Sequence, residues 1–170
     1  MHHTSGPTTL RRLHPDDLRA FQAYRRDPVV AQFQGWEAVD DAQATGFLRA
    51  VAQMTPLLQP GQWAQIAIAD SATDALLGDL GLHLSTDGTE AELGITLARD
   101  AQGAGHATRA VQMATTLIFD QSRAQRITYW TDARNAPARR LATRTGFTFH
   151  KLIVTDGVEE AFHTLPRPTA

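Results

Sequence analysis

The segment from residue 89 to residue 132 contains the pattern that most restricts the fold of this chain. Residues 89–98 alternate apolar and polar side chains, as in a strand with one buried face. The turn "QGAG" at 102–105 is followed by apolar residues spaced three and four apart up to about Ser122, which predicts an amphipathic helix. The sequence "RITYWTD" at 126–132 then predicts a buried strand. A strand–helix–strand unit of this kind indicates a fold in which helices pack on a sheet.

Other strand and helix candidates lie on both sides of this unit. Helices are predicted at 15–27, 40–54 and 137–145, the second of them opened by a capping pair of Asp40 and Gln43. Further strands are predicted at 8–13, 62–69, 76–84, 147–154 and 158–165. Three aromatic residues, Phe47, Phe119 and Trp130, are expected in the core. We therefore expect a mixed α/β (α+β) fold in one domain, residues 8–166, preceded by a flexible lead-in at 1–7.

The composition excludes several classes of site. The chain has no cysteine, so it contains no disulfide, thiolate metal site or cysteine nucleophile. Its net charge of −2 gives no electrostatic basis for binding nucleic acid or an anionic membrane, and no apolar run is long enough to span a bilayer. The histidines are scattered without the spacing of a helical metal site. We expect a soluble cytoplasmic domain with no metal, no nucleic-acid partner and no membrane contact.

Gly103 and Gly105 stand where the helix that follows must begin. A helix N-terminus presents unpaired N–H groups and a partial positive charge, so it can bind a phosphate without basic side chains. Glycine lets the backbone approach the phosphate oxygens closely. The alternative is that the glycines only form a tight turn, and the motif alone does not decide between the two. The segment lacks the Gly-Lys-Ser/Thr end of a P-loop and the third glycine of the dinucleotide fingerprint, where Thr108 stands.

The same segment resembles a signature of the GNAT superfamily of acyl-CoA N-acyltransferases. Gln102-x-x-Gly105-x-Ala107 fits the family's Q/R-x-x-G-x-G/A turn, whose consecutive N–H groups hold the coenzyme A pyrophosphate. Farther on, "NAPARRLATRTGF" at 135–147 resembles the family segment in which an asparagine opens a helix that ends at Gly-Phe. With "LRRLHPDDL" and "AELGITL", the likeness to the ribosomal-protein N-terminal acetyltransferase-like branch runs from about Leu10 to Leu165.

The resemblance implies a mixed, mostly antiparallel seven-stranded sheet flanked by helices and splayed between its fourth and fifth strands. It also implies acetyl-CoA as the cosubstrate. The residues expected to hold it belong to the strand beside the pantetheine arm, the glycine turn and the later helix segment: Ile95, Thr96, Leu97, Gln102, Gly103, Ala104, Gly105, His106, Ala107, Thr108, Asn135 and Arg140. His106 is expected to contribute its N–H and not its ring. Arg139 is the alternative to Arg140 for a phosphate contact, and an exposed basic helix face is the other explanation of these arginines.

Amide formation from a thioester needs a base for the amine and a donor for the oxyanion. By resemblance the base is Glu92, in the strand at 89–98. Glu90 is the next candidate, ahead of Asp79 and His83, and a solvated strand face is the alternative explanation of the two glutamates. Gly94 would allow a bulge that turns a backbone N–H of this strand toward the oxyanion.

Two residues depart from the family pattern. Ala142 stands where many members have the tyrosine that protonates the leaving thiolate, and Ala138 where a serine that bonds the coenzyme is common. The tyrosines of the chain, Tyr24 and Tyr129, lie elsewhere in the pattern. The leading hypothesis is an acetyl-CoA-dependent N-acetyltransferase that acts by direct amine attack. A non-catalytic acyl-CoA-binding module and an unrelated nucleotide-binding protein are the alternatives.

The resemblance indicates a class of acceptor and not one acceptor. Gln34, Gly35 and Trp36 follow the first helical region, where relatives line the acceptor pocket, so Gln34 and Trp36 are the substrate candidates. The acceptor is expected to be a small-molecule amine or a protein N-terminus. The sequence leaves the oligomeric state open, with a homodimer as one candidate because dimers are common among relatives.

Overall fold

The computed structural model describes residues 1–169 of the chain. Its helices are α1 (Leu18–Arg25), α2 (Pro28–Ala31), α3 (Asp41–Gln53), α4 (His106–Gln121) and α5 (Ala136–Arg144), with the 3-10 turns η1 (Pro15–Asp17) and η2 (Arg99–Ala101). Its strands are β1 (His2–Ser5), β2 (Thr8–Arg12), β3 (Trp63–Asp70), β4 (Leu76–Leu84), β5 (Glu90–Leu97), β6 (Arg126–Asp132), β7 (Thr148–Thr155) and β8 (Val158–Pro166). None of the helices formed by residues 1–169 is both long and apolar enough to cross a membrane.

The strands form one eight-stranded sheet in the order β1-β2-β3-β4-β5-β6-β8-β7. β5 and β6 run parallel, and the other neighbouring pairs are antiparallel. This mixed, mostly antiparallel sheet confirms the predicted fold class. The predicted count of seven strands was wrong, because residues 2–5, expected to be a flexible lead-in, pair with β2 from Ser5↔Thr8 to His2↔Arg11. β2 supplies the hydrogen-bonding partner for a segment whose polar side chains show no strand pattern of their own.

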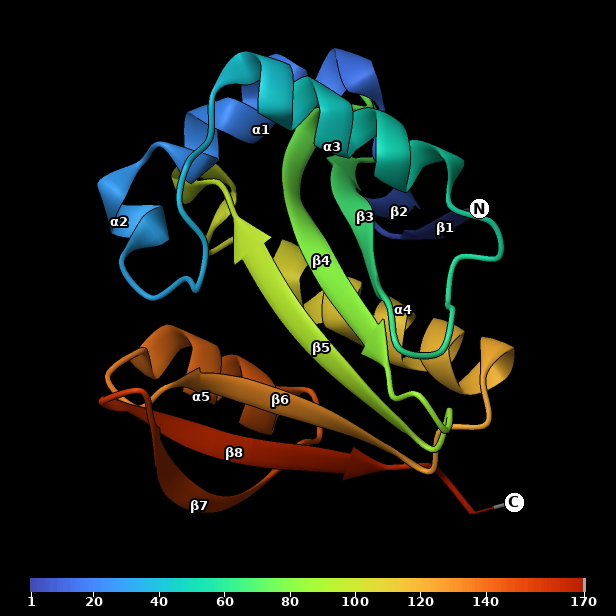
Figure 1. The fold of residues 1–170 in the computed structure, drawn as a ribbon, viewed down its shortest axis with the longest axis vertical. Coiled ribbons are helices and arrows are strands. Elements are labelled where there is room, and N and C mark those ends of the chain that lie inside the picture. The colour runs from blue at the N-terminus through green and yellow to red at the C-terminus, as the bar shows by residue number, and fades with distance from the viewer. Residues whose placement is uncertain (170) are drawn as a thin grey trace.

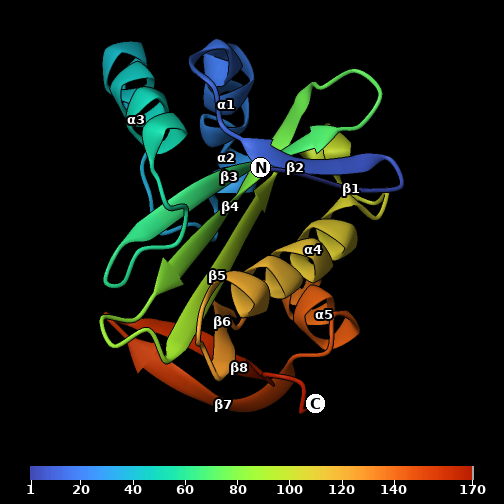
Figure 2. The same cartoon turned by 90° about the vertical axis from the view of Figure 1, so that its right-hand side faces the viewer.

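Helices cover both faces of the sheet. Figure 2 shows α4 and α5 on one side and α1 and α3 on the other. α4 packs small and branched residues such as Ala110, Val111 and Ile118 against the central strands, and this is the larger core. α1 and α3 form a smaller core around Phe21 and Leu48 on the opposite face. As predicted, α3 begins at a capping box in which Asp40 and Gln43 bond each other's backbone.

Phe47 was wrongly expected in the core. It lies on the outer helix α3 and is 39% exposed, although its ring stacks on Phe21 with centroids 5.7 Å apart. Phe119 and Trp130 are half-buried, so each has one side against the protein. The helical spacing of Phe47 was correct, but the surface of α3 that faces solvent is wider than the spacing alone indicates.

The sheet opens between β5 and β6. Their parallel pairing runs only from Glu90↔Arg126 to Glu92↔Thr128, whereas β5 continues to Leu97 and β6 to Asp132. Figure 1 shows the two strands diverging from a shared end, with β6, β8 and β7 turned away from the rest of the sheet. This confirms the splay expected between the fourth and fifth of the predicted strands.

Candidate functional site

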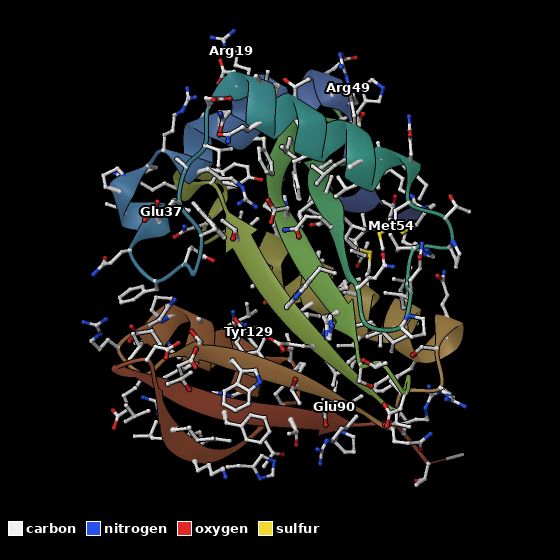
Figure 3. The ribbon with its side chains drawn as sticks, in the orientation of Figure 1. Arg19, Glu37, Arg49, Met54, Glu90 and Tyr129 are labelled. Carbon is white, nitrogen blue, oxygen red and sulfur yellow. The ribbon has the colours of Figure 1, made fainter. Side chains whose placement is uncertain are left out.

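The opening between β5 and β6 is part of a cleft of about 630 Å³. β5, the turn before α4 and one face of α5 line it, with the α2 segment beside them. Figure 3 shows Tyr129 at this opening and Glu90 near the end where β5 and β6 run together. The residues that the sequence analysis had singled out and that line the cleft are Gln34, Ile95, Thr96, Leu97, Gln102, Gly103, Gly105, His106, Ala107, Thr108 and Asn135.

The turn before α4 presents bare backbone to the cleft. Gly103 and Gly105 have φ angles of 81° and 83°, in the left-handed region that favours glycine. Gly105 is the N-cap of α4 and makes no side-chain hydrogen bond to the helix. A Cβ at Gly103 would meet no atom within 4 Å, whereas one at Gly105 would lie 2.6 Å from Arg109 Nη1. The turn thus combines free N–H groups, a helix dipole and room for close approach, which are the properties that a phosphate site requires.

The arginine at the cleft is Arg144 and not Arg140. Arg140 lies with Arg139 beside a second hollow between α5 and β7 and does not line the cleft. Arg144 lines the cleft and donates from Nε to Thr108 Oγ1 at 3.0 Å. The two arginines are four residues apart and project from the same side of α5, but only Arg144, at the C-terminal end of the helix, reaches the first turn of α4 and the cleft.

Ala104 is the other predicted coenzyme residue that does not line the cleft. Its carbonyl accepts a hydrogen bond from Arg109 Nη1 at 3.2 Å. The peptide at Ala104 is therefore held from the α4 side of the turn, between the two glycines that do face the cleft.

β5 forms one wall of the cleft with its backbone. Ser85 N–H donates to Glu90 O, so the main-chain groups of the even-numbered residues face β4 and those of Leu93, Ile95 and Leu97 face β6. Since the pairing of β5 with β6 ends at Glu92↔Thr128, the main-chain N–H and C=O groups of Ile95 and Leu97 face the opening. Gln102 Nε2 bonds the Leu97 carbonyl at 3.2 Å and joins the strand to the glycine turn.

The expected bulge at Gly94 is absent. The pairing of β4 with β5 runs unbroken from Leu84↔Ala91 to Gly78↔Leu97. The divergence of β6 already frees one edge of β5, so no irregularity in β5 itself is needed to expose its N–H groups.

Asn135 caps α5 at the edge of the cleft. Its Oδ1 accepts from Ala138 N–H at 3.2 Å, which satisfies one of the first N–H groups of the helix. Asn135 and Ala138 both line the cleft. The residue that caps α5 is therefore also placed to contact a ligand.

Tyr129 is a cleft residue that the sequence analysis missed. It follows Thr128, the last residue of β6 that pairs with β5, and it lines the cleft while only 3% exposed. Its hydroxyl makes no hydrogen bond within residues 1–169, and burial alone raises the pKa of the phenol. The hydroxyl therefore stays protonated and can donate a hydrogen bond to a ligand. The sequence contains no local signal for this role, because it depends on β6 leaving β5 after Thr128.

Glu92 lies on the face of β5 opposite α4. Its neighbours Ala91 and Leu93 belong to the core beneath α4, so alternation turns Glu92 to the other side, where it is half-buried and outside the cleft lining. Burial raises the pKa of its carboxyl, and repulsion from Glu160 and Glu90 adds to this. A raised pKa makes the carboxylate a stronger base at neutral pH.

The alternative bases are engaged in other contacts. Glu90 forms an ion pair with Arg126. Asp79 is 1% exposed and accepts hydrogen bonds from three side chains, among them Gln65 Nε2 at 2.7 Å. The ring of His83 packs 5.2 Å from that of a tryptophan on β3. In the described part of the chain, residues 1–169, no three histidine or acidic side chains gather as they would around a metal ion.

The two substrate candidates are separated by the structure. Gln34 lines the cleft and Trp36 does not. Trp36 packs over the guanidinium of Arg25, whose Cζ lies 4.4 Å from the ring centroid. Arg25 also binds Asp79 at 3.2 Å, so Trp36 helps to attach the segment after α2 to the sheet.

The sequence matches the family described as Acetyltransferase (GNAT) domain over residues 8–148. A curated relative from Bacillus licheniformis, named "Uncharacterized N-acetyltransferase p20", is 26% identical over 141 residues, which covers 82% of this chain and 78% of the relative.

Solved structures share the fold over almost the whole chain. An acetyltransferase of the GNAT family from Bacillus anthracis superposes with a TM-score of 0.83 at 16% identity, covering 98% of both chains. RimL, a ribosomal L7/L12 α-N-protein acetyltransferase in complex with coenzyme A, gives 0.81 at 14% identity over 96% of both chains. Spermidine N-acetyltransferase from Vibrio cholerae, in complex with CoA and spermine, gives 0.79 at 18% identity over 95% of this chain and 96% of the other.

At these identities the solved structures establish the likeness of fold, while the family match establishes kinship over most of the sequence. The chain belongs to the GNAT acetyltransferase family.

Proposed function

We propose that this protein transfers the acetyl group of acetyl-CoA to a primary amine. The observation that carries the proposal is the joining of two features in one cleft: the glycine turn before α4 and the unpaired edge of β5. A diphosphate fits the first, and an arm that contains amide groups fits the second. Coenzyme A has both in one molecule, and RimL and spermidine N-acetyltransferase, which share the fold, contain it.

The coenzyme would be held mainly by backbone. The N–H groups at Gly103, Gly105 and His106 are available to the diphosphate oxygens. The main-chain groups of Ile95 and Leu97 can pair with the pantetheine amides, as when a strand is added to a sheet edge. The chain is acidic overall, so this arrangement explains how it could bind a strongly anionic cofactor with few basic side chains at the cleft.

The thioester supplies an activated acetyl group, and the protein supplies placement, a base and hydrogen-bond donors. Glu92 accepts a proton from the amine, directly or through a water, and the unprotonated amine then attacks the carbonyl carbon. The free N–H groups of β5 stabilise the oxyanion. Tyr129 can donate a hydrogen bond to the departing sulfur, which would compensate for the alanine at position 142. The C–N bond forms, the C–S bond breaks and the second proton of the nitrogen passes to the departing thiolate, without a covalent enzyme intermediate.

The acceptor is an amine of a protein N-terminus or of a small molecule. RimL and spermidine N-acetyltransferase are named for acceptors of these two kinds, although both have the fold seen here. Recognition must therefore depend on side chains around the cleft, and Gln34 on the α2 segment is the candidate from the sequence that lines it.

The test is an assay of free thiol with acetyl-CoA and a panel of N-terminal peptides, polyamines and other small amines. Thiol release that requires both enzyme and amine is expected for at least one acceptor. Glu92→Gln should lower kcat by about a hundredfold or more, as loss of a general base does. Silence across the panel, with coenzyme A bound, would instead support a non-catalytic acyl-CoA-binding module. Full activity of Glu92→Gln would reject Glu92 as the base.

A further inference from the structure

His106 borders the cleft, and its ring bonds a buried residue that does not. His106 is the first residue of α4 and is 9% exposed. Its Nδ1 lies 2.9 Å from Oγ1 of Thr8, a fully buried residue at the start of β2 that is 98 positions away in the sequence. A single hydrogen bond therefore connects the hairpin of β1 and β2 to the first residue of α4.

Arg109 makes a second connection between the hairpin and the turn. Its Nη1 donates to Ala104 O at 3.2 Å, within the turn. A Cβ built on Gly6, in the β1–β2 connection, would lie 3.3 Å from Arg109 Nε, and one built on Gly105 would lie 2.6 Å from Nη1. The guanidinium thus lies between the hairpin and the turn and contacts both.

The hairpin itself is attached to the rest of the sheet. Ser71, just after β3, donates its N–H to Pro7 O at 3.1 Å and its hydroxyl to Gly6 O at 3.0 Å. Thr8 pairs with Asp70 of β3 in the sheet. The backbone of Thr8 is therefore held in place by the sheet, and a side chain that bonds Thr8 is restrained with it.

We propose that Thr8 is a positioning residue for cofactor binding: through the His106 ring it holds the backbone of residues 105–107 so that their N–H groups face the cleft. The inference rests on the proposed function, because it concerns the turn assigned to the diphosphate. Thr8 does not line the cleft and acts only through His106.

The expected consequence is a change in affinity and not in chemistry. Without the hydroxyl of Thr8, the buried His106 nitrogen loses its partner and the ring must move to find another. A shift of the first turn of α4 would misalign N–H groups whose hydrogen bonds depend steeply on distance and angle. The affinity for coenzyme A should fall about tenfold, which is the size of effect expected when a charge-assisted hydrogen bond is weakened and not lost altogether.

Thr8→Val tests this, because it replaces the hydroxyl by a methyl of similar shape. Thr9→Val is the matched control: Thr9 is also buried, at 2% exposure, and its Oγ1 is 2.9 Å from Thr4 Oγ1. That bond stays within the hairpin and lies on the face of β2 that does not reach His106. Both variants therefore lose one side-chain hydrogen bond of β2, and only one of them loses the bond to α4.

Calorimetry with coenzyme A and steady-state kinetics with acetyl-CoA and with S-acetylpantetheine, which lacks the diphosphate, give the readout. Thr8→Val should raise the Kd for coenzyme A and the KM for acetyl-CoA about tenfold, leave kcat unchanged, and leave kcat/KM for S-acetylpantetheine unchanged. Thr8→Ser should restore the wild-type values. Should Thr8→Val not fold, Thr8→Ala, which also removes the hydroxyl, is measured in the same way with the same expectation.

Equal coenzyme affinity for Thr8→Val, Thr9→Val and the wild type would overturn the inference while leaving the proposed function intact. Equal losses with coenzyme A and with S-acetylpantetheine would also overturn it, because the effect would not concern the diphosphate. Absence of coenzyme A binding by the wild type would reject the proposed function, and the inference with it.

Discussion

The glycine turn before α4 can be tested by adding one methyl group at Gly103. This residue has a φ of 81°, and a Cβ there would meet no protein atom within 4 Å. Gly157, at the tip of the β7–β8 hairpin, also has a φ of 81° and the same open surroundings. Gly103→Ala and Gly157→Ala therefore impose the same backbone strain at two sites, and only the first of these borders the cleft.

The two effects of the methyl group can be separated by size. An alanine in the left-handed region costs about 1–2 kcal/mol, so each variant should melt a few degrees below the wild type, roughly 3 °C per kcal/mol for a chain of this length. At Gly103 the methyl group also enters the space that a phosphate would occupy. Losing one charge-assisted N–H···O bond costs about 2 kcal/mol, which is roughly a thirtyfold increase in Kd.

Thermal unfolding and calorimetric titration with coenzyme A measure the two quantities independently. Both variants should show similar losses of melting temperature, and Gly103→Ala alone should bind coenzyme A about thirtyfold more weakly. Unchanged coenzyme affinity in Gly103→Ala would refute the assignment of the turn. A similar loss of affinity in Gly157→Ala would show that the effect is a general loss of stability.

Three further predictions concern side chains. Arg144→Met should weaken coenzyme A binding about tenfold in calorimetry, and Arg140→Met, one turn earlier on the same helix and outside the cleft lining, should not; equal effects would contradict the placement of Arg144. Tyr129→Phe should lower kcat about tenfold or more with little change in the KM for acetyl-CoA, and an unchanged kcat would remove the hydroxyl from the reaction. Folding raises the pKa of the Glu92 carboxyl above its usual value of 4.5. The protonated carboxyl therefore contributes stability below pH 4.5, and this contribution is lost as the pH rises through the pKa of the folded protein. Glu92→Gln should therefore raise the melting temperature at neutral pH and not well below pH 4.5; a lower melting temperature at neutral pH would contradict the burial argument.

The predicted elements that the structure confirmed are those with strong local patterns. β4 has the predicted bounds, 76–84, because polar loops delimit an apolar run on each side. α4 begins one residue after Gly105. There the two glycines end just before the apolar residues with helical spacing begin. The asparagine at 135 caps its helix as such residues commonly do. These features depend on residues close in sequence, so the sequence alone contains the information.

The features that were missed depend on partners distant in sequence. β1 is a strand because β2 is next to it, and its own residues carry no strand signal. Tyr129 reaches the cleft because β6 leaves β5 after Thr128, which no local pattern reports. The choice of Arg144 over Arg140 depends on which turn of α5 lies beside the first turn of α4, where Thr108 bonds Arg144. The bulge at Gly94 was unnecessary for the same reason that Tyr129 was missed: the splay itself opens the edge of β5.

The central claim is that backbone N–H groups before α4 bind the diphosphate of coenzyme A. The most direct measurement follows the amide resonances of the protein by NMR during titration with coenzyme A and, separately, with pantetheine. Coenzyme A should shift the amides of Gly103, Gly105 and His106 more than those of the distant Gly157, and pantetheine should shift those of β5 alone. Binding of coenzyme A that leaves the amides of the glycine turn unchanged would contradict the claim.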